Sequence, residues 1–130
     1  IAYAVCELIG AAVAALLWMA CRPEERGVGG GAGLPSRALA EFLGTYVLVL
    51  TVGLNVLGHS PVGALSVSAS LTSMVFSLGS VSGAHFNPAV TTAVICSGRG
   101  VISLPDAVAY VVAQIAGGIC GAGTYRLMYL

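Results

Sequence analysis

The chain has 130 residues, of which 58% are hydrophobic and 8% charged, and its formal net charge is zero. Soluble domains carry roughly 25% charged residues, so this composition excludes an ordinary water-soluble fold. A mean hydropathy of +0.98 indicates lipid as the solvent, and the zero net charge argues against a nucleic-acid partner.

The first apolar stretch covers residues 1–21, carries only one charge, Glu7, and is predicted to span a membrane. Residues 22–37 hold half of the charged residues, two prolines and a run of glycines, which is typical of a flexible, solvated linker. Because the chain begins inside one apolar stretch and ends inside another, we interpret it as a fragment of a longer protein.

Two apolar stretches after the linker are predicted to cross the membrane as a pair. Residues 38–57 contain Glu41 as their only charge, and a turn around His59 separates them from residues 62–82, which contain no charge. As a helix the second stretch would be about 31 Å long at 1.5 Å per residue. That length matches the ~30 Å hydrocarbon core of a bilayer.

Residues 83–98 are also uncharged but are too short to cross a bilayer alone. Asn87 followed by Pro88 is typical of a helix N-cap and the first helical position. A helix from Pro88 to Gly98 would be about 16 Å long, half of the hydrocarbon core. We therefore predict that this segment enters the membrane, turns at its midplane and returns to the side from which it came.

Such a segment provides the groups that line a narrow polar pathway. The half-helix would point its N-terminus, with a partial positive charge of ~0.5 units, and the Asn87 amide donor at the bilayer centre. A row of acceptors with one central donor suits water or a polyol, and the positive helix end opposes cations and protons. The expected acceptors are the backbone carbonyls of Gly83, Ala84, His85 and Phe86.

A polar break at residues 99–106 leads into the last long apolar stretch, residues 107–130, which is predicted to be a fourth span. Near its start the sequence VAYVVAQIAG aligns with IAYAVCELIG at the beginning of the chain, and Gln114 falls opposite Glu7. Repeated bundles of membrane helices are typical of channels and transporters. We interpret residues 1–21 as the same kind of element as the last helix, one repeat earlier.

The sequence SGAHFNPAVT at residues 82–91 resembles the first Asn-Pro-Ala loop of the aquaporins, or major intrinsic proteins. AEFLGTY at residues 40–46 resembles the start of the first helix in that family, and residues 109–117 resemble its third helix. The resemblance covers residues 38–130 as one half-unit. It implies an all-α membrane protein with an aquaporin-like right-handed helical bundle and a re-entrant half-helix, here as a fragment of the six-span fold.

The resemblance also implies a passive, multi-pass channel for water, and in some branches for glycerol and other small neutral solutes. We expect no enzymatic activity, cofactor or metal. The implied partners are the lipid bilayer, the permeating solutes, the complementary half-unit of the parent chain and further copies in a homotetramer. The implied pore motif is Asn87, Pro88 and Ala89; the implied lining side chains are Val67, Leu71, Phe86 and Val90; the implied supports of the loop are Glu41 and His85.

Val67 lies twenty residues before Asn87 and, by the resemblance, would fall at the narrow selectivity constriction. Many water-selective members of the family have an aromatic residue at that place. A valine would leave the constriction wider and less polar, which favours larger neutral solutes.

Two observations favour residues 38–130 as a first half. The family's second half follows Asn-Pro-Ala with arginine, whereas this sequence has Val90. Four arginines also share one side of the predicted spans, which the positive-inside tendency makes cytoplasmic. They are Arg22, Arg26, Arg37 and Arg99. We favour a tandem parent, with 1–21 as the last helix of a preceding half-unit and 22–37 as the linker. The alternative makes 1–21 a third helix and 38–130 a second half without its arginine.

Two other functions fit parts of the sequence. An inverted-repeat transporter would need ionisable residues at the midplane, but the spans offer only Glu7 and Glu41, near their ends. A non-conducting structural membrane protein would use the same helices for assembly.

Nothing in the sequence indicates an enzyme or a metal site. It offers no nucleophile paired with a base, no phosphate-binding loop and no metal-ligand spacing. The four cysteines form no CxxC pair, and we expect them to be small buried thiols.

Overall fold

The computed structural model describes residues 5–23 and 31–130 with their side chains, and residues 2–4 by their backbone. Residues 24–30 of the predicted linker, including Arg26, lie outside the described part of the chain. Within that part the helices are α1 (Ala2–Cys21), α2 (Leu34–Leu57), α3 (Gly63–Ser82), α4 (Pro88–Cys96) and α5 (Leu104–Met128).

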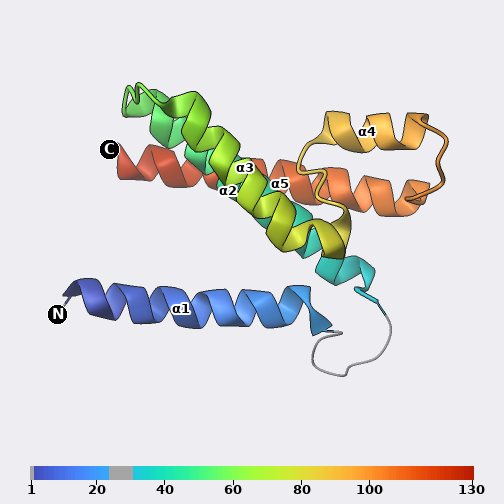
Figure 1. Ribbon diagram of the computed structural model, residues 1–130, viewed down its shortest axis with the longest axis horizontal. Coiled ribbons are helices and arrows are strands. Elements are labelled where there is room, and N and C mark those ends of the chain that lie inside the picture. Colours follow the sequence, from blue (N-terminus) through green and yellow to red (C-terminus); the bar gives the residue numbers. More distant parts are fainter. Residues whose placement is uncertain (1, 24–30) are drawn as a thin grey trace.

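The helices form a crossed bundle with a short helix beside it. Helices α2 and α3 run side by side and obliquely to α5, α4 runs alongside the first half of α5, and α1 lies along one side (Figure 1). The main contacts join α2 to α5, α2 to α3, and α4 to α5. Helices α2, α3 and α5 are each long and apolar enough to cross a membrane. The expectation of an all-helical membrane fold is therefore confirmed.

The first helix, α1, covers 20 residues, Ala2–Cys21, and its role as a fourth span stays a prediction. The C-terminal end of α1 is tied to the bundle. Ser36 Oγ donates to the carbonyl of Ala20, and Arg22 donates to the carbonyl of Ser77.

Helix α2 begins at Leu34, inside the stretch that we predicted to be linker. Pro35 lies in the first turn, where its missing N–H costs no hydrogen bond and its fixed φ suits the helix. Arg37, predicted to lie in the linker, is therefore part of the helix.

Helix α5 also begins before its predicted start, at Leu104 rather than at residue 107. The Ser103 hydroxyl caps it by accepting the Asp106 N–H at 3.3 Å, and a proline again occupies the first turn. The helix ends at Met128. Asp106, predicted to lie in a polar break, therefore sits in the first turn, where a negative charge complements the helix dipole.

Helices α2 and α5 approach closely because two glycines of α5 face the α2 backbone. A Cβ on Gly117 would collide with the carbonyl oxygen of Phe42, and a Cβ on Gly121 would lie 2.7 Å from that of Tyr46. The two glycines are one helical turn apart and both are buried. This spacing of small residues allows close backbone packing in lipid.

Much of the remaining helix surface is apolar and exposed. Cys21 is the only cysteine that is buried in the described part of the chain, so the expectation of buried thiols is wrong for the other three. They are Cys6, Cys96 and Cys120. In a membrane protein a thiol on the outer face of a helix still lies in an apolar environment, because lipid or a neighbouring helix covers that face.

Candidate pore loop and half-helix

The segment between α3 and α4, residues 83–87, reverses the chain with unusual backbone angles; we call it the α3–α4 loop. Gly83 has φ 88° and closes α3 by donating to the carbonyl of Gly79 at 2.9 Å. Ala84 and Phe86 also have positive φ, 54° and 50°. Non-glycine residues in this region cost about 1–3 kcal/mol each, so the surroundings must hold the loop in place.

Glu41 of α2 provides that support with four hydrogen bonds. Its Oε1 accepts the hydroxyl of Ser82 at 2.6 Å and the N–H of His85 at 3.0 Å. Its Oε2 accepts the N–H of Phe86 at 2.6 Å and the amide of Gln114 at 2.8 Å. The carboxylate is fully buried. A buried carboxylate is tolerated where hydrogen bonds satisfy its oxygens, and these four do so.

Gln114, Thr91 and His85 extend the network towards α4. The Gln114 Nε2 also reaches Thr91 Oγ1 at 3.0 Å, and His85 Nδ1 lies 3.0 Å from the same hydroxyl. Thr91 and Gln114 are 0% and 1% exposed. One glutamine side chain of α5 therefore joins the carboxylate of α2 to the first turn of α4.

Tyr110 of α5 supports the other side of the loop. Its hydroxyl donates to the carbonyl of Ser82 at 2.8 Å, and the edge of its ring meets the His85 ring at 5.5 Å between centroids. The guanidinium of Arg37 lies over the Tyr110 ring and pairs with Asp106 at 2.6 Å. The starts of α2 and α5 are therefore joined beside the loop.

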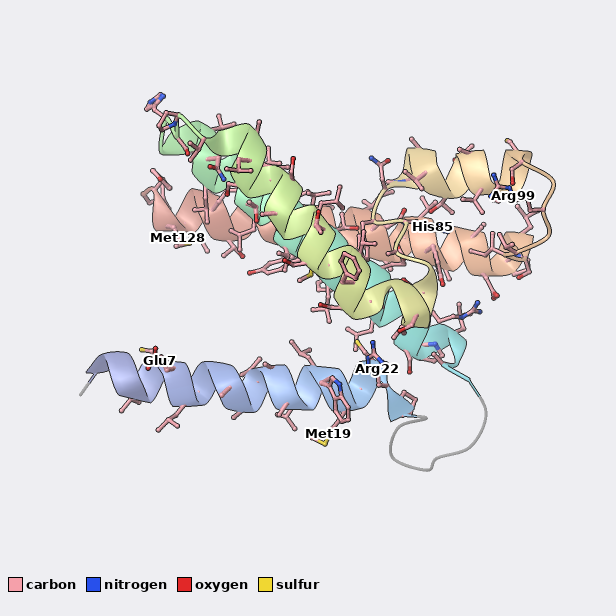
Figure 2. The ribbon with its side chains drawn as sticks, in the orientation of Figure 1. Glu7, Met19, Arg22, His85, Arg99 and Met128 are labelled. Carbon is pink, nitrogen blue, oxygen red and sulfur yellow. The ribbon has the colours of Figure 1, made fainter. Side chains whose placement is uncertain are left out.

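The half-helix α4 begins as the sequence pattern indicates. The Asn87 side chain accepts the Ala89 N–H at 2.8 Å, and Pro88 occupies the first turn. This cap uses Oδ1 and leaves the two Nδ2 donors available on an exposed residue. Helix α4 ends at Cys96, so it is about 14 Å long at 1.5 Å per residue. Figure 2 shows His85 in the loop before α4 and Arg99 beyond its other end.

The structure places the predicted lining residues in different surroundings. Val90 is 43% exposed and Leu71 is 39% exposed. Val67 is half-buried and borders a groove of about 660 Å³ between α2 and α3.

Phe86 departs from the expectation of a lining side chain. Its ring is 2% exposed and packs on Gly44 of α2, where a Cβ would collide with the ring. The prediction for this side chain is corrected, because the absence of a side chain at Gly44 opens a space that the ring fills.

Several residues of this arrangement were not identified from the sequence as functional. They are Gly44, Ser82, Thr91, Tyr110 and Gln114. The alignment that set Gln114 opposite Glu7 marked one of these positions as a polar site in an apolar helix, without indicating its partners.

The chain is similar to membrane channel proteins. A family model described as "Major intrinsic protein" matches residues 31–130. The chain is 41% identical over 91 residues to glycerol uptake facilitator protein-like 6 of Lactiplantibacillus plantarum, a match that covers 68% of this chain and 41% of that protein.

Two further relatives show the same extent of similarity. Aquaporin NIP1-1 of Arabidopsis thaliana is 42% identical over 101 residues, covering 72% of this chain and 33% of that protein. Aquaglyceroporin AqpS of Rhizobium meliloti is 38% identical over 106 residues, covering 74% and 45%. The matches thus span between a third and just under half of these relatives. No solved structure gives a significant match.

Proposed function

The chain belongs to the major intrinsic protein family, and on that premise we propose that it supplies one half of a passive membrane channel for water and small neutral solutes. One observation carries the proposal. The buried carboxylate of Glu41, itself bonded by the amide of Gln114, binds the backbone of the α3–α4 loop. This loop ends at Asn87, which is the N-cap of the half-helix α4.

The chemistry of this turn fits a neutral polar solute. The exposed Asn87 side chain caps α4 with its oxygen, so its NH₂ group can donate to a passing hydroxyl or water oxygen. The carbonyls of residues 83–86, as proposed acceptors, would accept hydrogen bonds from the O–H groups of the solute. The N-terminal end of α4 adds a partial positive charge, which opposes cations and protons.

Two observations support the proposed solute class, the names of the relatives and the residue at Val67. The relatives are named as a glycerol uptake facilitator, an aquaporin and an aquaglyceroporin. Val67 borders the groove between α2 and α3 and adds no aromatic ring to it. We propose that the channel admits water and solutes of the size of glycerol.

The partners follow from what half a channel lacks. The exposed apolar faces of the helices would meet lipid, a complementary half-unit of the same parent chain and further copies in a homotetramer. In the tandem arrangement that the sequence favours, α1 would be the last helix of a preceding half-unit and α2 to α5 would form the next one.

Osmotic shrinkage of vesicles that contain the full parent protein tests the proposal, with water and with glycerol as permeants. We compare the natural protein with Asn87→Asp, which keeps an oxygen to cap Ala89 but removes the amide donors and adds a negative charge. We expect fast flux in the natural protein and the permeability of protein-free vesicles in the variant. Thr92→Val is the control, because the exposed Thr92 hydroxyl donates to the carbonyl of Pro88 in its own helix.

The same experiment distinguishes the other functions. Flux that depends on a proton or sodium gradient would indicate a coupled transporter. Flux no faster than bare lipid, from protein that is folded and inserted, would indicate a structural membrane protein.

A further inference from the structure

The hydroxyl of Thr91 lies among three polar atoms in a fully buried place. Gln114 Nε2 and His85 Nδ1 are each 3.0 Å from Thr91 Oγ1, and the carbonyl oxygen of Asn87 is 3.3 Å away. A hydroxyl has one proton to donate and can accept from other donors. The way these contacts share that proton fixes which nitrogen of the His85 ring carries a hydrogen.

In the hydrogen bond between Gln114 and Thr91, the glutamine amide is the donor. Gln114 Nε2 lies 2.8 Å from Glu41 Oε2, an oxygen that also accepts the Phe86 N–H. Turning the amide over would set its oxygen against this carboxylate oxygen, so the NH₂ group must face Glu41. Its second proton then points at Thr91 Oγ1. The threonine oxygen is therefore an acceptor towards Gln114, and its own proton is left for the histidine or for its helix.

Comparison with the other threonines of the chain assigns that proton. Hydroxyls that donate to the carbonyl one turn earlier do so at 2.8 to 2.9 Å. These are the hydroxyls of Thr45, Thr51, Thr92 and Thr124. The corresponding distance for Thr91 is 3.3 Å, beyond the usual O–H···O range of about 2.5–3.0 Å. The histidine nitrogen is thus the acceptor within reach.

We propose that Thr91 and Gln114 are positioning residues that hold His85 as the neutral tautomer with its hydrogen on Nε2. Nδ1 is then occupied as an acceptor, and Nε2 becomes a donor. A Cβ placed on Gly83, an exposed residue, would lie 3.5 Å from Nε2. Within the described part of the chain, Nε2 has no hydrogen-bond partner.

The tautomer decides whether the His85 ring adds a hydrogen-bond donor or an acceptor to the carbonyls of the loop. With hydrogen on Nε2, the ring presents a second donor beside Gly83, suited to a hydroxyl or water oxygen. With hydrogen on Nδ1, the ring would present a bare lone pair, which binds a proton or a metal cation. This functional consequence rests on the proposed channel, whereas the tautomer itself does not.

Solid-state NMR of the full protein in lipid vesicles, with ¹⁵N-labelled histidine at pH 8.5, tests the assignment. At this pH an ordinary imidazole is neutral. The His85 signals are those that disappear in His85→Gln. We expect Nε2 to give the signal of a protonated ring nitrogen and Nδ1 that of a bare one. The reverse pattern, a mixture of the two, or two protonated nitrogens would overturn the proposal, whether or not the vesicles conduct water.

Two variants test the part assigned to Thr91. Thr91→Val keeps the shape and removes the hydroxyl, so we expect the single-tautomer pattern to be lost. Thr91→Ser restores the hydroxyl and should restore the pattern, which separates positioning from packing. Thr92→Val should leave it unchanged, because its hydroxyl bonds within its own helix. A Thr91→Val protein that keeps the full Nε2–H pattern would show that the hydroxyl does not select the tautomer.

Discussion

At the scale of single residues, Glu41 is the group on which the loop depends. Its two oxygens accept four donors that come from α3, the loop and α5. Two of these donors are the backbone N–H groups of His85 and Phe86, for which the Glu41 carboxylate is the acceptor. Because the loop contains strained angles at Ala84 and Phe86, the conformation persists only while these bonds exist.

Replacing Glu41 by Gln tests this dependence. The amide has one oxygen instead of two, so its NH₂ group must face one pair of donors, which is a backbone N–H and a side chain, Ser82 or Gln114. The side chain can turn and accept from the NH₂ group, but the backbone N–H is left unpaired. A buried donor without a partner costs about 1–3 kcal/mol, and we expect a loss of that size in the free energy of unfolding. Denaturant unfolding in detergent measures it. Glu7→Gln, at an exposed position, is the control and should change stability by less than about 0.5 kcal/mol.

A second prediction at this scale concerns Gly44, whose missing side chain makes room for the Phe86 ring. Gly44→Ala should destabilise the fold by about 1–3 kcal/mol, because overpacking forces the ring or helix to move. In Gly123→Ala, where nothing lies within 4 Å of the new Cβ, we expect no loss. Combining Gly44→Ala with Phe86→Leu should recover part of the stability; purely additive losses would contradict a direct contact.

At the scale of helices, the crossing of α2 and α5 sets the site, because Glu41 and Gln114 come from these two elements. Gly117 faces the backbone of Phe42, and a backbone carbonyl cannot turn aside as a side chain can. The closeness of the crossing thus depends on positions on α5 that carry no functional group.

The neighbouring glycines Gly117 and Gly118 make a matched pair for testing this. Gly117→Ala should separate α2 from α5, lower stability by about 2 kcal/mol or more, and weaken the bond between Glu41 and Gln114. Gly118→Ala should be tolerated, because its Cβ would lie at ordinary contact distances of 3.8 and 4.0 Å. Unfolding measurements compare the two. Equal losses would indicate a general intolerance of alanine in this helix.

The sequence predicted the elements better than their ends or their partners. Hydropathy located α2, α3 and α5, and Asn87 with Pro88 marked the start of α4. The starts of α2 and α5 were missed because their first turns carry charge and proline, which resemble loop composition. The network was missed because Glu41, Thr91 and Gln114 are far apart in sequence, and only the crossing of their helices brings them together.

At the scale of the whole molecule, one side of the α3–α4 loop is not covered by any other element in the described part of the chain. This is the side that would face a solute. Asn87, Ala89 and Val90 are exposed, and no half-helix other than α4 is present in the described part of the chain. The matched relatives are more than twice the length of the matching segment. A pathway closed on all sides needs a complementary half.

We therefore expect the isolated 130-residue chain to conduct no water unless two copies pair. Vesicles that contain the purified chain should shrink at the rate of protein-free vesicles, whereas the parent protein should shrink them faster. Light scattering follows the shrinkage, and crosslinking reports whether copies have paired. Conduction by a chain that remains monomeric would refute the expectation.

The position of the Glu41 contacts along the chain has a consequence for biosynthesis. Glu41 leaves the ribosome before the loop that it holds, but Gln114 follows only with α5. A nascent chain that ends before Leu104 contains the strained loop and the Glu41 carboxylate. It lacks Gln114 and the Tyr110 hydroxyl, which donates to the carbonyl of Ser82. We therefore expect that α5 must be inserted before the α3–α4 loop can settle, so that a helix made after the loop completes the loop's hydrogen bonds.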